Sequence, residues 1–473
     1  MIKAGTKDAQ ILMLEGIQAL SRASIQGMKI NVPYCKKQKI YLTKKIQKLK
    51  EEFAKTETGK LWKKYYRTPN FNSDDQLRDI LFNKKKLKSV KKTKPSKTYP
   101  KGNDSVDKEA LTLLAKEEPD IKILAEINRF SPLLNTFING ILKEQVDGIL
   151  HPTFSLHTTK SFRSSSQNIN FQNQPNRDPL QKKIIRSCFI PSKGNQIIAA
   201  DFTGIEVGIS SCVHKDPKML DYVRHPEKNN MHTDLAIQCY LLDQFEKSGS
   251  EKTLRKGAKN GFVFPQFYGD YYGNNVPVLS DWGNLPTKGS YKSKDGLKLM
   301  TGLYLGDHLK RKGIRNFNDF KDHIQDVEND FWNKRFKVYK QWKENNVKKY
   351  FKKGYLNTLT GFTVQGMMSK NGINNYPIQG PAFHCLLKTF IETDRRIIAK
   401  KMKSKLIGQI HDELVFDACP DEKDELLDMV RRVACIWLKK QWPWIIIPLE
   451  VEANVFDIDA NWAQDSKVIK LAA

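Results

Sequence analysis

The chain has 473 residues, which is enough for two to four domains with a substantial core. Lysine and arginine number 80 against 52 aspartate and glutamate, and the resulting charge of +28 makes nucleic acid the first partner to consider, although a soluble protein with solvated lysines has the same balance. Seven cysteines without short paired spacing exclude a disulfide framework and a zinc ligand set, and the absence of a long apolar run excludes a membrane span and an export signal.

The first 150 residues are predicted to be mostly helical and basic. Apolar residues recur at helical spacing among lysines from Pro33 to Phe53, a second helix is expected from Asp75 to Phe82, and helical periodicity resumes from Lys108 to Leu150. Between Lys84 and Lys101 there are nine lysines, two prolines and no acid, so this stretch is expected to be a mobile loop. Contact with phosphates and a solvated linker are two equally natural uses of such a run.

Two later segments are predicted to be strands that carry acids. The run from Gln196 to Phe202 is rich in β-formers and presents Asp201 at its end. The run from Leu406 to Asp417 predicts a tight hairpin with Asp412 and Glu413 at its tip. The helices expected around these strands are Lys252 to Phe264, Asn318 to Tyr350 and Pro381 to Met402.

These residue types suit phosphoryl transfer. Two aspartates on one sheet could hold a pair of divalent cations, and hard carboxylate oxygens suit magnesium, although either acid alone would more often only end a strand or fill a turn. Arg255 and Lys259 are four residues apart on a predicted helix, so they share a face and can hold neighbouring phosphates of a triphosphate. The aromatic residues that follow could support a nascent base pair, although such a stripe is more often core: Phe262, Phe264, Phe267 and Tyr268.

In their order along the chain, these motifs resemble the polymerase region of family A DNA polymerases, the group of bacterial DNA polymerase I and its phage relatives, from about Leu12 to Ala453. Ala200 to Glu206 is similar to the first palm motif, Arg255 to Lys259 to the fingers-helix motif, and Gln409 to Phe416 to the last palm motif. The supporting segments that match in the same order are Thr159 to Pro175, His232 with Thr233, Gly354 with Tyr355, and Asn375 to Gly380.

The resemblance implies an α+β fold shaped as a right hand, with a palm built on an antiparallel sheet, helical fingers and a helical thumb. Residues 1–150 would form the thumb and an N-terminal helical region with the basic loop 84–101. The implied palm and fingers are residues 151–215 for the first part of the palm, 216–365 for the fingers with an unexplained insertion at about 270–315, and 366–473 for the second part of the palm.

The resemblance also implies a role for each matched residue. Asp201 and Asp412 would be catalytic and would bind two Mg²⁺ ions, which Mn²⁺ could replace, with the Phe202 carbonyl as a further ligand and Glu413 as an accessory acid. Lys259 would supply a proton or charge to the leaving pyrophosphate. The implied dNTP-binding residues are Arg255, Lys259, His232, Phe262, Phe264, Phe267, Tyr268 and Glu206, the last of which would exclude a 2′-hydroxyl. The implied DNA-binding residues are Arg163, Gln172, Asn173, Asn375, Gln379 and His411.

The spacing after Lys259 departs from the family pattern. The family places an aromatic residue four positions after this lysine and Tyr-Gly at eight and nine, whereas here Val263 is four after it and Tyr268 is nine after it. Either Phe267 takes the tyrosine's place, or the helix contains one extra residue and Phe264 becomes the first aromatic. Pro265 predicts that the helix ends or bends there.

The predicted function is template-directed DNA synthesis, in which dNMP is added to a primer 3′ end and pyrophosphate is released by a two-metal mechanism. A single-subunit RNA polymerase is the alternative enzyme, and Glu206 argues against it because a small residue is expected there. An inactive nucleic-acid clamp is the alternative without catalysis, and retention of the charged motif residues argues against it. The predicted partners are primer–template DNA and dNTPs, and no membrane is expected.

The chain begins where the proofreading exonuclease domain of the family would end. We therefore expect no proofreading by these residues, and a separate exonuclease or processivity factor is a candidate partner. The expected location is the cytoplasm of a bacterial or phage-infected cell, with an organelle as the alternative.

Overall fold

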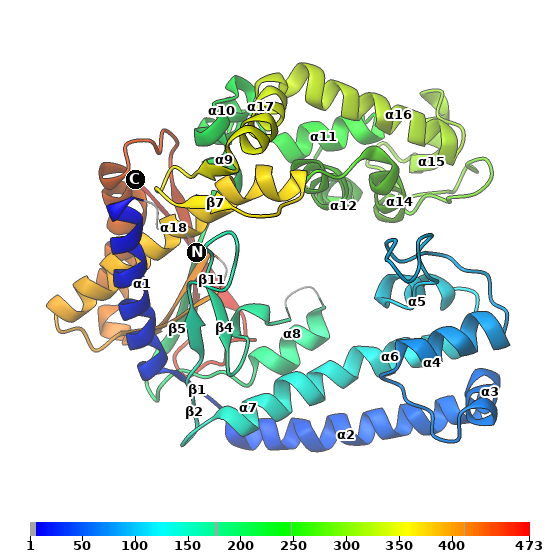
Figure 1. Ribbon diagram of the computed structural model, residues 1–473, viewed down its shortest axis with the longest axis horizontal. Helices are drawn as coiled ribbons and strands as arrows, with labels where there is room; N and C mark the ends of the chain where they lie inside the picture. Colours follow the sequence, from blue (N-terminus) through cyan, green and yellow to red (C-terminus); the bar gives the residue numbers. More distant parts are fainter. Residues whose placement is uncertain (1–5, 176–177, 247, 411) are drawn as a thin grey trace.

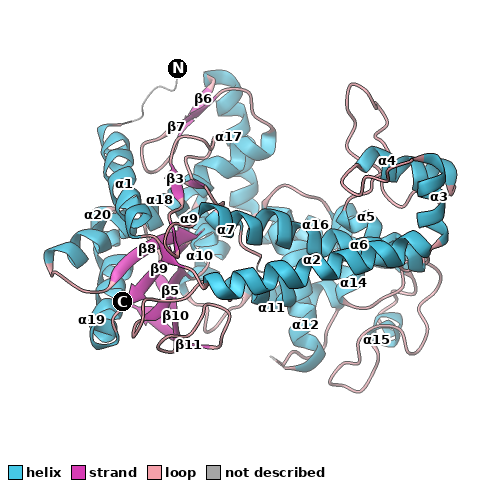
Figure 2. Ribbon diagram, turned by 90° about the horizontal axis from the view of Figure 1, so that it is seen from below, coloured by secondary structure: helices cyan, strands magenta, loops and turns pink. Residues whose placement is uncertain are grey.

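The computed structural model describes residues 6–175, 178–246, 248–410 and 412–473. Figure 1 shows a central body at the left, from which two helical arms extend to the right. Figure 2 shows that the strands of the main sheet gather in the central body, whereas both arms are mainly helical. The chain is therefore α+β, with its main sheet placed where the two arms meet.

The lower arm in Figure 1 is built on two long helices that lie side by side, α2 (Val32–Lys55) and α6 (Pro119–Pro132). Helix α2 begins where the Asn31 side chain accepts from the Tyr34 N–H, and it buries Leu42, Ile46, Leu49 and Phe53 along one face. The other elements of this arm are α3 (Glu57–Tyr65), α4 (Asp74–Arg78), η1 (Asp79–Lys84), α5 (Lys108–Leu114), η2 (Leu133–Ile138) and α7 (Asn139–Glu144), with short strands β1 (Met28–Lys29) and β2 (Ile149–Leu150) at its base. The helices predicted here are confirmed, although the last one is divided into α5, α6, η2 and α7.

The lysine-rich stretch 84–101 contains no helix beyond its first residue, which ends η1. Ion pairs attach it to neighbouring elements: Lys85 contacts Glu118 at 2.7 Å, and Lys92 contacts Asp104 at 2.7 Å. The stretch is therefore irregular, as predicted, but it is fastened to the arm by carboxylates that lie outside it.

The central body contains a five-stranded antiparallel sheet in the order β11-β10-β5-β9-β8. The central strand β5 (Gln196–Phe202) is confirmed at its predicted bounds, and the predicted hairpin is formed by β8 (Lys405–Ile410) and β9 (Glu413–Ala418). The strands at the other edge are β10 (Glu450–Phe456) and β11 (Ser466–Ala472).

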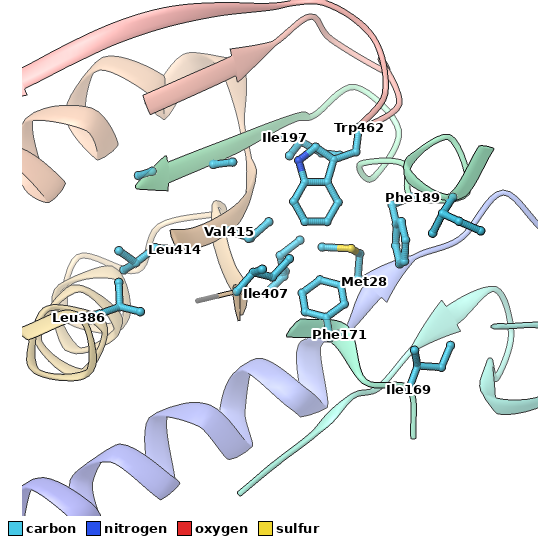
Figure 3. Close-up of a cluster of buried hydrophobic side chains, with 14 of the residues drawn as sticks. Met28, Ile169, Phe171, Phe189, Ile197, Leu386, Ile407, Leu414, Val415 and Trp462 are labelled. Carbon is cyan, nitrogen blue, oxygen red and sulfur yellow. The ribbon is translucent and has the colours of Figure 1, made fainter. Parts of the chain in front are cut away.

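Apolar side chains cover both faces of this sheet (Figure 3). Leu414 points to Leu386 of helix α18 (Lys370–Ala399), whereas Val415, the next residue of the strand, points to the side of Phe171 and Trp462. Helix α1 (Lys7–Gln26) packs on α18 and β8. The remaining elements of the body are β3 (Thr153–Ser155), β4 (Ser165–Gln167), η3 (Phe171–Asn173), α8 (Pro179–Arg186), α9 (Ile205–His214), η6 (Pro420–Glu422), α19 (Lys423–Arg431), η7 (Arg432–Trp437) and α20 (Leu438–Gln441).

The upper arm in Figure 1 has a hydrophobic core of its own. Its main helices are α11 (Met231–Tyr240), α12 (Gly249–Ala258), α14 (Tyr272–Trp282) and α16 (Phe317–Asp330). The other elements are α10 (Pro217–Arg224), η4 (Lys259–Val263), α13 (Phe264–Phe267), α15 (Leu305–Arg311), η5 (Phe331–Arg335), α17 (Lys337–Lys353), β6 (Tyr355–Asn357) and β7 (Thr363–Gln365). None of the described helices is both long and apolar enough to cross a membrane.

Candidate active site

The sheet brings the predicted acids together. Asp201 lies near the end of β5 and is paired in register with Glu413 on β9 and with Glu452 on β10. Asp412 directly precedes β9, and its carbonyl accepts a hydrogen bond of 3.2 Å from the Phe202 N–H. Residues more than 200 positions apart in the sequence thus form one acidic cluster at the end of the central strand.

The pKa values of three carboxyl groups in the acidic cluster are raised, although cations lie nearby. Asp201 keeps part of its surface in solvent, but the protein around it and the charges of Glu413, Asp412 and Glu452 raise its pKa to about 7. Loss of hydration also raises the pKa of Asp412 and Glu413, against the attraction of Arg163 and Arg186 respectively. Mutually repelling carboxylate oxygens suit a hard divalent cation.

The side chains available to such a cation are few. Within the described residues, no group of three or more His, Cys, Asp or Glu is arranged to hold a metal ion by itself. The Asp201 and Asp412 carboxylates line one cavity. Magnesium accepts one or two carboxylates and completes its shell with water or substrate oxygens.

Glu206 lies between the acidic cluster and the upper arm. Gly204 adopts the left-handed conformation, with φ of 61°, and this turns the chain from β5 into α9 so that Glu206 lies in the first turn. Its carboxylate accepts a 2.5 Å hydrogen bond from the Tyr268 hydroxyl. Arg163 approaches both Glu206, at 3.5 Å, and Asp412, at 3.6 Å.

Cations of the upper arm lie together at the C-terminal end of helix α12, beside His232. Arg255 of α12 donates to Thr233 at 3.3 Å and to Asn230 at 3.1 Å, which fixes its guanidinium group. The Lys259 ammonium lies 5.2 Å from the centre of the Phe264 ring, and burial and Arg255 lower its pKa. Burial, with Lys259 and Arg255, lowers the pKa of His232 to about 3, so this histidine is neutral at pH 7.

The spacing after Lys259 is explained by a π-helical turn. The Phe264 N–H donates to the Lys259 carbonyl five residues back, so residues Lys259–Val263 contain one residue more than an α-helical turn would. Pro265 falls in the first turn of the following helix α13, where its missing N–H costs little, and the helix continues to Phe267. Of the predicted end or bend at Pro265, the end is wrong, and of the two spacing alternatives the structure has the one with an extra residue.

This turn decides which aromatic residues face the site. Phe262 is fully buried and packs edge-on against Phe331, so its place on a base-pair surface is wrong for this structure. Phe264, Phe267 and Tyr268 line a cavity of about 280 Å³. The other residues of the cavity wall are Gly204, Ile205, Glu206, Val207, Ser210, Tyr339, Asn375, Ile378, Gln379 and Asp412.

The candidate DNA contacts are spread around the same region. Asn375 and Gln379, in the N-terminal part of α18, form part of the cavity wall. The Gln172 amide donates to Gln409 at 2.8 Å and so lies beside the hairpin. His411 and the side chain of Asn173 lie outside the described residues.

Two cations that the sequence analysis missed lie on the other side of the acidic cluster. Lys182 and Arg186 of α8 line a second cavity together with Asp201, Asp412 and Glu413. Arg186 also lies over the Trp462 ring at 4.7 Å. Their spacing of four residues is the signal that singled out Arg255 and Lys259, and it was present here too.

A sequence model of DNA polymerase family A matches residues 34–275 and 323–464, which together make up most of the chain. The chain belongs to DNA polymerase family A. Among curated proteins, DNA polymerase I of Lactococcus lactis is 26% identical over 398 residues, which cover 81% of this chain and 39% of that protein. DNA polymerase I of Aquifex aeolicus is 27% identical over 464 residues, or 96% of this chain and 67% of that protein.

The fold of this family A chain is also that of a solved polymerase. It is similar to the POL domain of Pol1 from M. smegmatis with a TM-score of 0.72 and 21% identity, covering 95% of this chain and 70% of that one. The predicted right-hand architecture is therefore confirmed, with the central body as palm and the helical arms as fingers and thumb. The chain spans about two fifths of the length of the Lactococcus relative.

Proposed function

We propose that this family A chain is a template-directed DNA polymerase that adds dNMP to a primer 3′ end and releases pyrophosphate. The observation that carries the proposal is the placement of Asp412 beside Asp201 in one cavity and opposite Phe264 in another. The Lys259 ammonium lies over the Phe264 ring, with Arg255 one helical turn before it. The M. smegmatis domain is in complex with DNA primer-template and dNTP, and we assign the same classes of ligand to this chain.

We keep the division of the chain proposed from the sequence. The thumb and N-terminal helical region would be residues 1–150, the palm 151–215 and 366–473, and the fingers 216–365. The family match is interrupted at residues 276–322, which supports an insertion in the fingers close to the expected 270–315.

Asp201 and Asp412 would hold two Mg²⁺ ions, or Mn²⁺, together with the Phe202 carbonyl, and Glu413 would assist. When bound, such ions stabilise the charge on the attacking and leaving oxygens of an in-line displacement. The two aspartates would therefore fix the place where the primer 3′-oxygen meets the α-phosphate of the dNTP. The repulsion among the acids is the physical support for this assignment.

The fingers would hold the triphosphate. Arg255, already fixed by Asn230 and Thr233, would pair with the phosphates, and Lys259 would neutralise or protonate the pyrophosphate as its bond to the α-phosphate breaks. His232 would donate a neutral N–H. Its Nδ1 is buried and has no hydrogen-bond partner among the described residues.

Replacing Glu206 by alanine is expected to admit ribonucleotides, because the side chain that would occupy the space of a 2′-hydroxyl is removed. We expect the preference of kcat/KM for dCTP over CTP to fall by on the order of 10²-fold. Tyr268→Phe is the matched control, since it removes only the hydrogen bond to Glu206. Unchanged sugar preference in Glu206→Ala would rule this residue out as the gate and return the single-subunit RNA polymerase to consideration.

The π-helical turn predicts different results for Phe262, which is buried, and Tyr268, which lines the cavity. Tyr268→Ala is expected to lower kcat/KM for dNTP addition by about 10-fold to 10²-fold, as loss of base stacking worth 1–3 kcal/mol requires, with little change in stability. Phe262→Ala is expected to lower the free energy of unfolding by about 3–5 kcal/mol, because it empties a fully buried site. Thermal unfolding measures the stability of each variant, and single-turnover addition measures its use of dNTP. A stable Phe262→Ala variant would contradict the burial of this side chain.

A further inference from the structure

The match to the family model is interrupted within the fingers. Residues 283–316, which we call the fingers segment, connect α14 to α16 and fall within the interruption of the family match. The segment is folded: Tyr291, Leu305 and Leu309 are buried in the fingers core. Ser290 and Asn316 pair across its base. Its exposed side chains are therefore held on a defined surface.

The fingers segment is strongly basic. It contains eight lysines and arginines and two aspartates. Four of its lysines are exposed and make no ion pair within the described ranges: Lys288, Lys292, Lys294 and Lys298. The Met300 N–H donates to Glu251 at 2.9 Å, which seats the segment on the first turn of α12, the end of this helix remote from Lys259. The segment is thus held by its backbone and its apolar side chains, and these four lysines are left for a partner.

The thumb carries a second basic surface, the stretch 84–101. Some of its lysines are used to attach it, as Lys85 and Lys92 show. Other lysines are exposed and make no ion pair in the described part of the chain: Lys86, Lys88, Lys94, Lys97 and Lys101. The ion pairs of Lys85 and Lys92 therefore hold the stretch, with these exposed lysines, at the thumb tip.

The two basic surfaces lie at the same end of the molecule. In both views the thumb tip, with α4 and α5, and the fingers segment, with α14 and α15, are at the right, one on each arm (Figures 1 and 2). Surfaces of like charge repel, so these two surfaces cannot hold each other. A polyanion between the arms would contact both.

We propose that the fingers segment binds the phosphates of the primer–template duplex that the thumb stretch 84–101 also contacts, so that the duplex is held from two sides. A DNA duplex carries one negative charge per about 1.7 Å of its axis and presents phosphates around its whole circumference. A duplex between the arms would therefore present phosphates to both surfaces. This inference rests on the proposed function, since it takes the primer–template as ligand.

Three variants with equal loss of charge test the proposal. The fingers variant is K288Q/K292Q/K294Q/K298Q, and the thumb variant is K86Q/K88Q/K94Q/K97Q. The control is K401Q/K403Q/K405Q/K440Q, whose exposed lysines belong to β8, the turn before it and α20, at the opposite end from the arm tips (Figure 2). Fluorescence anisotropy with a labelled primer–template duplex in EDTA gives Kd against salt concentration without catalysis. A single strand of the template's length is the second ligand.

The fingers variant and the thumb variant are each expected to bind the duplex at least tenfold more weakly at about 0.1 M salt, and to flatten the dependence of log K on log salt by about 3 to 4. The control is expected to stay within twofold of the wild type. A fingers variant that binds the duplex as the control does would overturn the proposal. An equal loss for the single strand would also overturn it, because the ligand would then be unpaired DNA.

Two further measurements keep the outcome separate from folding and from catalysis. Acetylation of the wild-type protein is expected to be slowed by duplex at Lys288, Lys292, Lys294 and Lys298 but not at Lys401, and equal labelling with and without DNA would contradict the contact. All three variants should keep the melting temperature of the wild type, and the control variant should add one nucleotide at the wild-type rate. A wild-type protein that adds no nucleotide would instead refute the proposed function, while the binding data would still decide the duplex contact.

Discussion

Replacing Asp201 by asparagine is expected to slow nucleotide addition by on the order of 10³-fold, and Asp412→Asn should have a similar effect. Each substitution keeps the shape of the side chain and removes the charge that the proposed metal ions require, which is worth several kcal/mol in the transition state. Single-turnover addition of one dNMP to a saturating primer–template measures the loss. Anisotropy should show that the duplex still binds.

Stability distinguishes a lost charge from a damaged site. Asp201 lies beside Glu413, Asp412 and Glu452, whose charges help to raise its pKa to about 7, so the neutral asparagine relieves repulsion at neutral pH. In EDTA the melting temperature of Asp201→Asn is therefore expected to equal or exceed that of the wild type. Glu452→Gln is the matched control: it removes a neighbouring charge outside the proposed ligand set and should leave the rate within a few fold. Full activity in Asp201→Asn would contradict the assignment.

Replacing Lys259 by alanine is expected to lower the rate of addition by about 10²-fold to 10³-fold. Its ammonium group is the charge on the fingers helix assigned to the departing pyrophosphate, and loss of one preorganised donor costs about this much. Rapid-quench kinetics over a range of dNTP concentrations separate the maximum rate from dNTP affinity. We expect Lys259→Ala to change mainly the rate, and Arg255→Ala to change mainly the affinity.

Lys256 provides the control on the same helix. It is exposed, three residues before Lys259 and one after Arg255, so Lys256→Ala removes the same charge from another face of α12. Its rate and dNTP affinity should stay near those of the wild type. Equal losses in Lys256→Ala and Lys259→Ala would mean that only the general positive field of the fingers matters.

Local patterns were sufficient to predict the elements that carry the acids. The apolar run ending at Asp201 and the paired runs around Asp412 have the short period and the turn expected of strands, and β5, β8 and β9 form there. The right-hand fold followed from the resemblance of the ordered motifs to the family, and not from the local patterns themselves. Burial on both faces of the sheet could be inferred from the continuous apolar run of β5.

What the sequence did not reveal depends on single hydrogen bonds and on contacts between distant segments. The π-helical turn after Lys259 rests on one hydrogen bond, which the Phe264 N–H donates to the Lys259 carbonyl five residues back. In this turn the Phe262 side chain lies in the core. The attachment of the lysine stretch uses acids such as Asp104 and Glu118, which lie outside the run itself. The sequence predicted a helix that starts at Pro381, whereas α18 begins at Lys370. Both Pro377 and Pro381 lie inside this helix.

Primer extension with the wild-type chain tests the central claim most directly. A labelled primer annealed to a longer template is incubated with Mg²⁺ and either the four dNTPs or the four NTPs, with Asp201→Asn as the negative control. The account predicts extension to the end of the template with dNTPs, little or none with NTPs, and none with the variant. Extension that prefers NTPs, or no extension by a wild-type protein that binds the primer–template, would contradict it.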